Sequence, residues 1–375
     1  MMAKRRFSGR SFAGRLFLLL LGVVLGVSIA EGLLRLSGYE PRIHVVYREN
    51  FRLSENPKLQ YELQPGSIDG QSRISQAGLR DREFAIEKAP GTYRIMIIGD
   101  SVAYGLRVKA DQAFPKQLEG LLGDLPHDDV QFEVLNLGVS GYNTQQSVER
   151  LRVLGLSYRP DLIIYAYSLN DPQTFSLESQ GLAAMEERAR RELRPGESIL
   201  RGLSRSRLFL LLWRSFQDPW TQGEVHAQGS PDYQAVVSGS YDAYFEALHR
   251  GETWNDVKDG LLILKELGEE TGARTWVALL PIQLGRGRVA PLSSLRARLQ
   301  EEVTALGLFT LDLGPPMIEA NQNDSKQLFR DPFHPTPEGH RILAESLYGA
   351  LLESDFWDQT MNPLSAQVRG NSSEE

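Results

Sequence analysis

The stretch Arg94-Ile95-Met96-Ile97-Ile98-Gly99-Asp100-Ser101 decides the fold. An apolar run of this length, ended by glycine and two small polar residues, is typical of a strand buried on both faces of a parallel sheet. A serine directly after such a strand, where a helix begins, lies at the carboxyl edge of the sheet with its N–H facing the same space. Taken alone, the same residues also fit an ordinary turn in which Ser101 is the N-cap of a helix.

Further short apolar runs follow along the chain, and stretches with helical spacing alternate with them. These runs are Phe132–Leu135, Leu162–Tyr167, Thr275–Leu280 and Phe309–Leu313. The amphipathic stretches are Phe114–Leu122, Thr144–Leu154, Trp254–Leu267, Leu292–Leu306 and Pro337–Leu352. The alternation predicts an α/β domain with a central parallel five-stranded sheet covered on both faces. In such sheets the active site lies at the carboxyl ends of the strands.

The N-terminus carries a targeting signal. Residues 1–15 form a basic leader, and an apolar segment over residues 16–36 is close to the length that spans a bilayer. The extension from Glu31 to Arg35 favours a transmembrane signal anchor that stays in the protein. The alternative is a signal peptide that is removed, because Ser28-Ile29-Ala30 is a passable small-x-small cleavage site. Both interpretations export the rest of the chain, with the basic end on the cytoplasmic side.

The remaining segments differ in composition from the alternating core. Residues 37–91 are predicted to be an exported stalk or lead-in, with short strands at His44–Tyr47 and Tyr61–Leu63. The main domain is predicted over residues 92–355, interrupted by an insertion over about 172–252 that serves either as a lid over the site or as a surface elaboration. The tail over residues 356–375 is predicted to be disordered.

Composition excludes several classes of function. The net charge of -7 argues against nucleic acid as the main partner. The chain has no cysteine, which excludes disulfides, thiolate catalysis and thiolate metal sites. A phosphate-binding G-x-x-x-x-G-K loop, expected of a nucleotide-binding protein of this fold class, is absent from the sequence. Four histidines are scattered along the sequence and indicate no metal site: His44, His127, His226 and His249. No cofactor is expected.

Polar residues follow the other predicted strands at the same edge as Ser101. A loop with two glycines, Gly138 and Gly141, comes after the second strand, and Asn170 comes after the third. Asp331-Pro332-Phe333-His334 precedes the last predicted helix. Together these supply a hydroxyl, glycine N–H groups, a carboxamide and an Asp/His pair, which are the parts that acyl transfer requires.

Gly99-Asp100-Ser101, Gly141, Asn170 and Asp331-x-x-His334 resemble, in order, the four sequence blocks of the SGNH (GDSL-like) hydrolases. The resemblance covers about residues 93–352 and implies a flavodoxin-like three-layer α/β/α fold, no metal, and hydrolysis or transfer of ester-linked acyl groups. It implies Ser101 as nucleophile, His334 as base, and Asp331, alone or with backbone carbonyls, as the group that orients it. The implied oxyanion donors are the N–H groups of Ser101 and Gly141 and the side chain of Asn170.

Two departures from the family pattern concern these blocks. Ser168 stands where the family often has glycine, and the second block offers two glycines. Gly141 is preferred because the family's oxyanion glycine usually precedes a polar pair and a helix, which leaves Gly138 for the bend. Structural roles are expected for the remaining polar and aromatic candidates: Asp100, Asp171, His340, Trp213, Trp220, Tyr241 and Tyr244.

The function expected is that of an esterase that removes acyl groups, such as acetyl, from an envelope or extracellular glycan. Gly78-Leu79-Arg80-Asp81, together with the N-terminal segment, resembles a bacterial, envelope-facing subgroup associated with cell-surface glycans. Three alternatives stay open: an O-acyltransferase using the same residues, a lipase or thioesterase at the membrane surface, and a non-catalytic glycan-binding or assembly factor. Acyl group, substrate, oligomeric state and protein partners are not determined by the sequence.

Overall fold

The computed structural model describes most of the predicted α/β domain and the N-terminal helix. The described residues are 9–37, 50–69, 72–125, 130–172, 206–209, 241–284, 288–289, 292–323 and 327–354. The chain divides into two compact units, Met1–Val46 with Glu186–Tyr233, and Tyr47–Met185 with Gln234–Glu375. Several predictions therefore lie outside the described residues: the strand at His44–Tyr47, most of the insertion, the tail, and His44, His127, His226, Trp213 and Trp220.

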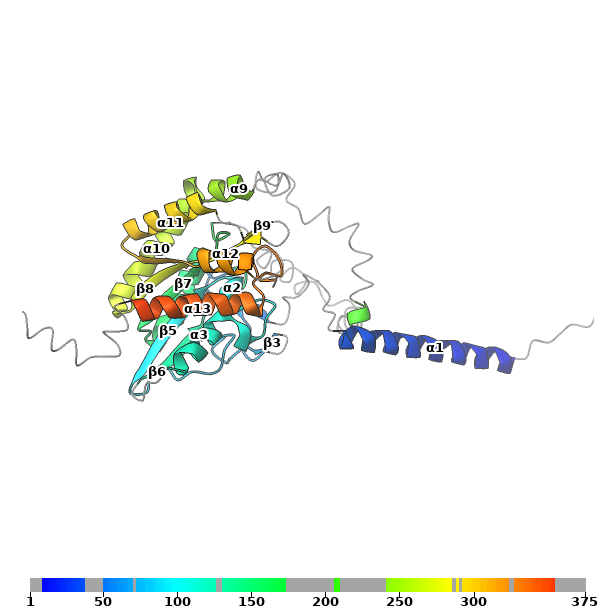
Figure 1. The fold of residues 1–375 in the computed structure, drawn as a ribbon. Helices are drawn as coiled ribbons and strands as arrows, with labels where there is room; N and C mark the ends of the chain where they lie inside the picture. The colour runs from blue at the N-terminus through cyan, green and yellow to red at the C-terminus, as the bar shows by residue number, and fades with distance from the viewer. Residues whose placement is uncertain are drawn as a thin grey trace, which may run out of the picture. The chain divides into compact units, whose positions relative to one another are not determined.

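The larger unit is built on the five-stranded parallel sheet that the apolar runs predict (Figure 1). Its strands are β5 (Thr92–Gly99), β6 (Gln131–Asn136), β7 (Leu162–Tyr167), β8 (Arg274–Leu279) and β11 (Phe309–Asp312). The spatial order is β11-β8-β7-β5-β6, so the connections reverse direction on either side of β5. This is the flavodoxin-like order of a doubly wound sheet, in which ligands bind at the carboxyl ends beside the point of reversal.

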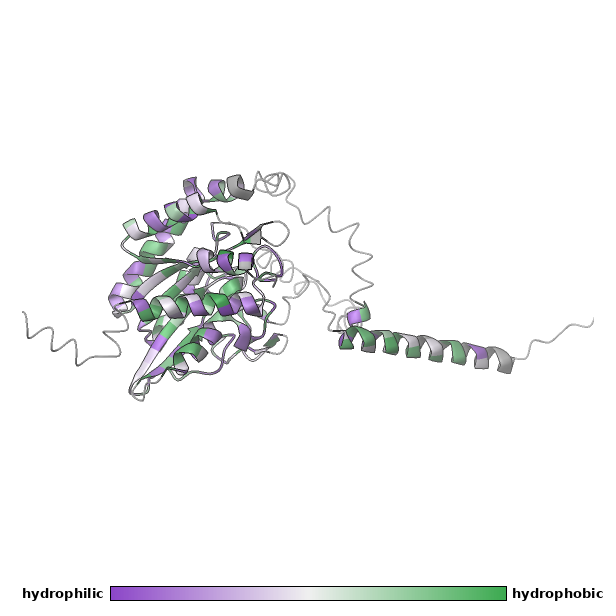
Figure 2. Ribbon diagram, viewed as in Figure 1, coloured by the Kyte–Doolittle hydropathy of each residue, from purple (hydrophilic) through white to green (hydrophobic). Residues whose placement is uncertain are grey.

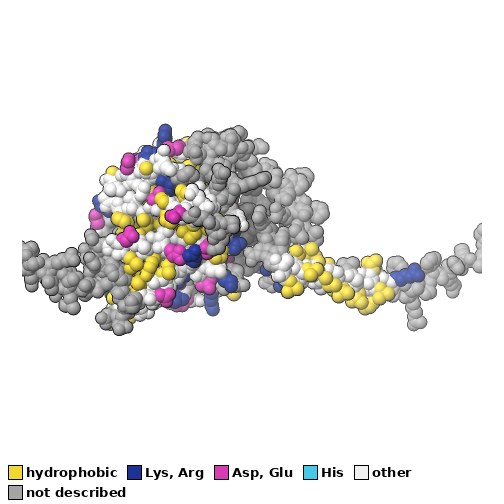
Figure 3. Space-filling view, in the orientation of Figure 1, with side chains coloured by type: hydrophobic (Ala, Val, Ile, Leu, Met, Phe, Trp, Pro, Cys, Tyr) yellow, Lys and Arg dark blue, Asp and Glu magenta, His cyan; other side chains and the backbone are white. Residues whose placement is uncertain are grey.

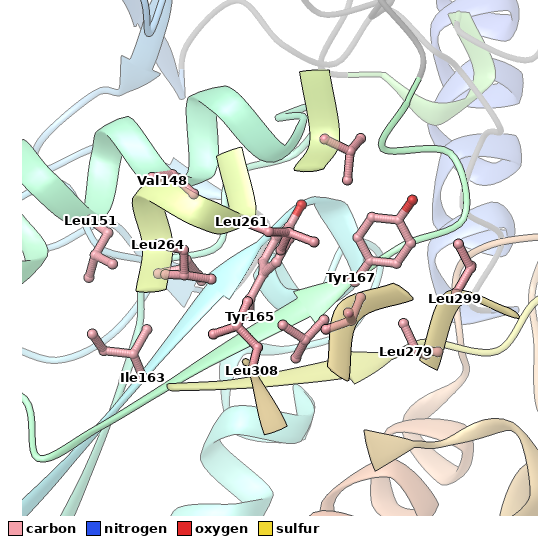
Figure 4. Packing of buried hydrophobic residues seen from close by; sticks show 14 of the residues in the cluster. Val148, Leu151, Ile163, Tyr165, Tyr167, Leu261, Leu264, Leu279, Leu299 and Leu308 are labelled. Atoms are coloured by element: carbon pink, nitrogen blue, oxygen red, sulfur yellow. The ribbon is translucent and has the colours of Figure 1, made fainter. Parts of the chain in front are cut away.

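Helices cover both faces of the sheet, and they bury β7 along its whole length and β5 from Arg94 onward. Met96 and Ile98 of β5 pack with α4 (Thr144–Val153), α9 (Tyr241–Leu248), α10 (Gly251–Thr271) and α11 (Ser293–Ala305). Ile95 and Ile97 pack with α3 (Phe114–Gly123), α12 (Gly314–Asn323) and α13 (Pro337–Glu353). The first of these cores is drawn in Figure 4, where Tyr165 and Tyr167 lie among the leucines of the helices and neighbouring strands.

Part of the predicted insertion belongs to this core. Helix α9 lies within residues 172–252, and its Tyr244 and Phe245 are buried against the sheet-covering helices. Packing is therefore the role of Tyr244, as expected from the sequence. His249 follows the same helix, and its Nε2 lies 2.8 Å from the hydroxyl of the buried Tyr167.

Two hairpins precede the sheet and form a third apolar core. They pair β1 (Phe51–Leu53) with β2 (Tyr61–Leu63), and β3 (Ile68–Asp69) with β4 (Ser72–Arg73). Strand β2 matches the predicted strand. Tyr61 packs in this core against Tyr104 and Tyr142, and its hydroxyl donates to the carbonyl of Ser140 at 2.8 Å. The lead-in thus packs on loops at the carboxyl edge of the sheet.

The smaller unit contains helix α1 (Gly9–Leu36), of which Phe17–Leu36 has a mean hydropathy of 2.4 and is long and apolar enough to cross a membrane. The ribbon of this helix is largely coloured as hydrophobic in Figure 2, and Figure 3 shows apolar side chains along it. Glu31 interrupts this apolar surface. Its carboxylate accepts hydrogen bonds from the Ser206 hydroxyl at 2.9 Å and from the N–H groups of Arg207 and Leu208 at 3.1 and 2.9 Å.

Candidate active site

A short turn at the end of β5 presents Ser101. Helix α2 (Ser101–Tyr104) begins immediately after the strand, and the Asp100 carboxylate caps it by accepting the N–H of Val102 at 2.8 Å. Gly105, in the left-handed region at φ 80°, ends it after a single turn. Ser101 therefore occupies the first helical position, with only 8% of its surface exposed, and Asp100 has the bracing role expected from the sequence.

Ser101, His334 and Asp331 form a continuous hydrogen-bonded chain. The Ser101 Oγ lies 2.9 Å from His334 Nε2, and His334 Nδ1 lies 2.7 Å from Asp331 Oδ1 and 2.9 Å from Oδ2. A carboxylate can only accept, so Nδ1 carries the ring proton and Nε2 is the nitrogen free to accept from Ser101. The structure thus brings together the three residues proposed as nucleophile, base and orienting acid, although Ser101 is 233 residues from His334.

The Asp331 carboxylate is held in its charged form. Partial burial raises its pKa, but this is outweighed by the hydrogen bond and charge of the His334 ring and by the backbone N–H groups of His334 and Phe333, which bring the pKa well below its usual range. These N–H groups lie 3.0 and 3.1 Å from Oδ1. Its other oxygen accepts from Arg107 Nη1 at 2.6 Å. Arg107 is not among the site residues predicted from the sequence. The only indication of its role there is its position in the turn that follows Ser101.

The two glycines of the second block serve different purposes. Gly141 lies in the loop between β6 and α4 at φ 78°, where a side chain would be strained. Gly138 has no such φ; a Cβ there would lie 2.4 Å from the backbone nitrogen of Tyr104. It therefore permits close approach of the loop to α2, which refines the expected role in the bend. Among the described residues, the N–H groups of Ser101 and Gly141 donate no hydrogen bond.

Asn170 and Asp171 follow β7 at the same edge of the sheet. The Asn170 Oδ1 is buried and has no partner among the described residues, while the residue as a whole is partly exposed. The carboxyl group of Asp171 is fully inside, where burial and the nearby charge of Asp100 raise its pKa well above the usual range. It bonds the Tyr165 hydroxyl and accepts from the N–H of Ser168 at 3.4 Å, so it anchors its loop as expected.

Tyr165 links this loop to α4, because its hydroxyl also lies 2.9 Å from Thr144 Oγ1.

The histidines outside the triad have structural positions in the described part of the chain. Burial lowers the pKa of His340 to about 3, and its Nδ1 accepts from the N–H of Phe114 at 3.3 Å. Burial likewise lowers the pKa of His249 to about 4. No group of three or more His, Asp or Glu side chains among the described residues could hold a metal ion.

The model of the GDSL-like lipase/acylhydrolase family matches residues 97–342, which is more than half of the chain. No curated protein matches the chain.

Several solved structures are similar to this chain. One is a lipolytic protein of the G-D-S-L family from Veillonella parvula, with 13% identity and a TM-score of 0.39, covering 70% of this chain and 100% of that one. Another is an acetylxylan esterase from Geobacillus stearothermophilus, with 16% identity and a TM-score of 0.36, covering 68% of this chain and 92% of that one.

Proposed function

Because the chain belongs to the GDSL-like lipase/acylhydrolase family, whose members hydrolyse esters, we propose that it cleaves its substrate through an acyl-enzyme on Ser101. The observation that carries this proposal is the Ser101–His334–Asp331 chain, with 2.9 Å from hydroxyl to imidazole and 2.7 Å from imidazole to carboxylate. Both distances are within hydrogen-bond reach for a nucleophile and its base. The Asp331 carboxylate fixes the ring tautomer that this step needs.

In the first half-reaction His334 Nε2 takes the Ser101 proton while Oγ attacks the ester carbonyl. The tetrahedral intermediate collapses, and the C–O bond to the alcohol breaks as His334 passes its proton to the leaving oxygen. In the second half-reaction His334 takes a proton from water, which attacks the acyl carbonyl; the bond to Ser101 Oγ then breaks as His334 passes this proton to Oγ, and the carboxylic acid leaves. Asp331 stays ionised throughout and stabilises the imidazolium that forms in each step.

The oxyanion of both intermediates is proposed to be held by the N–H groups of Ser101 and Gly141 and the side-chain amide of Asn170. Two features support this assignment. The two N–H groups have no competing partner among the described residues. The buried Oδ1 of Asn170 leaves its NH₂ group as the end available to the partly exposed side.

The proposed substrate class is an acylated, in particular acetylated, glycan of the bacterial envelope or its surroundings. Support comes from the exported location that the N-terminal segment predicts and from Gly78-Leu79-Arg80-Asp81. In the structure this motif underlies the nucleophile turn, since Arg80 donates to the carbonyls of Tyr104 and Gly105, each at 3.1 Å.

Labelling of the full chain in detergent with a fluorophosphonate tests the acyl-enzyme proposal. An activated serine is expected to form a covalent adduct that mass spectrometry maps to Ser101, and the same preparation is expected to hydrolyse p-nitrophenyl acetate. A matched control is Ser168→Ala, which removes another buried serine at this sheet edge and should label like the wild type. Folded protein that neither labels nor hydrolyses short esters would contradict the proposal.

We also propose that residues 16–36 remain in the mature protein as a signal anchor, with residues 1–15 in the cytoplasm and the catalytic domain outside. The contacts of Glu31 support this. Its carboxylate binds two backbone N–H groups and the Ser206 hydroxyl, and Arg207 Nη1 donates back to the Leu34 carbonyl at 3.3 Å. Cleavage after Ala30 would remove most of the helix that positions Glu31.

Retention of the anchor is checked by expressing the chain with an N-terminal epitope in a bacterium. The epitope is expected to stay on the full-length protein in the membrane fraction, co-migrating with Ala30→Leu, in which the small residue of the cleavage site is lost. A wild type that is shorter than this variant and lacks the epitope would show instead that the segment is a cleaved signal peptide.

A further inference from the structure

Arg107 joins the two halves of the proposed triad. Its Nη1 donates to Asp331 Oδ2 at 2.6 Å, although the two residues are 224 positions apart in the sequence. Arg107 belongs to the turn that begins at Ser101, whereas Asp331 belongs to the loop that carries His334. A contact between them therefore ties the nucleophile's turn directly to the base's loop, independently of the Ser101–His334 hydrogen bond.

The backbone that presents Arg107 is unusual and tightly held. Arg107 lies at φ 68°, in the left-handed region that a non-glycine residue rarely adopts unless its surroundings impose it. Arg80, only 2% exposed, imposes it here. Its guanidinium donates to the carbonyls of Tyr104 and Gly105 and, at 2.6 Å, to that of Val108, so both sides of Arg107 are fixed.

Asp69 completes this support from the lead-in. Its carboxylate accepts from Arg80 Nε at 3.0 Å and from the Tyr104 hydroxyl at 2.7 Å. The Arg80 guanidinium also lies over the Tyr104 ring, 4.7 Å from its centroid. The turn that presents both Ser101 and Arg107 is therefore held by several contacts from the lead-in.

We propose that Arg107 is a positioning residue for the reaction: it fixes the Asp331 carboxylate, and through it the His334 ring, relative to Ser101. This inference rests on the proposed function. Arg107 binds Oδ2 of the carboxylate, while the N–H groups of His334 and Phe333 bind Oδ1, so the carboxylate that orients the imidazole is held at both oxygens.

The test compares Arg107→Gln with Arg107→Lys in the full chain, with kcat and KM for p-nitrophenyl acetate measured separately near neutral pH. Arg107→Gln is expected to lower kcat/KM about tenfold. The loss should lie in kcat. Arg107→Lys keeps a cationic donor for Asp331 Oδ2 and should recover most of the wild-type kcat.

Arg82→Gln is the matched control, because Arg82 makes a similar ion pair with Glu119, in which Nη1 lies 2.7 Å from Oε2. A wild-type kcat in Arg107→Gln would overturn the proposal. To separate this from failure of the proposed function, the ring signals of His334 are also recorded at one fixed pH by NMR with labelled histidine, which needs no turnover. His334 signals that change in Arg107→Gln and not in Arg82→Gln support the positioning role even if no ester is cleaved, and unchanged signals refute it.

Discussion

Replacing Ser101 or His334 with alanine is expected to lower kcat/KM for a short ester by about four to six orders of magnitude. The 2.9 Å contact between these side chains makes them one catalytic unit, so that neither contributes much to the rate without the other. For the same reason the double variant should be no slower than the single variants. Initial rates with p-nitrophenyl acetate, corrected for spontaneous hydrolysis, measure the effect.

The fold should survive both substitutions, because Ser101 and His334 lie at the edge of the sheet and make no contact in its apolar cores. Unchanged circular dichroism and thermal unfolding serve as the control. Losses that multiply in the double variant, or a single variant that keeps more than about a hundredth of the wild-type rate, would mean that another residue supplies the nucleophile or base.

Replacing Gly138 with alanine is expected to damage both stability and activity. The added Cβ would lie 2.4 Å from the Tyr104 nitrogen and 2.7 Å from the Ala103 carbonyl carbon, both in the backbone of α2. Neither atom can yield without moving the helix that begins at Ser101. We expect the free energy of unfolding to fall by about 3 kcal/mol, and kcat/KM to fall about a hundredfold because the nucleophile is displaced.

Gly120→Ala is the control, since Gly120 is inside helix α3 and a Cβ added there would meet no atom within 4 Å beyond the helix's own backbone. That substitution should be neutral or stabilise the protein by up to about 1 kcal/mol. Denaturant unfolding of both variants gives the comparison. A Gly138→Ala protein as stable and active as the control would show that the loop and α2 are not in the close contact described.

The sheet could be predicted from the sequence because parallel strands buried on both faces appear in a sequence as unbroken apolar runs. The run from Arg94 to Ile98 falls inside β5, and the run from Phe309 to Leu313 overlaps β11. Ser101, Asp331 and His334 could be predicted because residues after parallel strands share one edge, and their order matches a family pattern.

The supporting polar contacts could not be predicted in this way. Arg80 and Arg107 look like surface arginines in the sequence, since hydrophobic periodicity carries no information about which backbone carbonyl or carboxylate a long side chain will reach. Arg80 is nonetheless buried, and its partners are up to 28 residues away. The purpose of Gly138 was also hidden, because a glycine required for space and one required for its φ look the same.

The third apolar core has a practical consequence for anyone who wishes to handle the enzyme without its membrane helix. The two hairpins before the sheet pack behind the nucleophile turn, since Tyr61 shares an apolar core with Tyr104 and its hydroxyl donates to the Ser140 carbonyl. Trimming to Thr92, where the sheet begins, would strip away Asp69 and Arg80 together with both hairpins. A water-soluble version should therefore start ahead of Asn50. Screening libraries aimed at new specificities should include residues 50–81 as part of the surroundings of the active site rather than treat them as a linker.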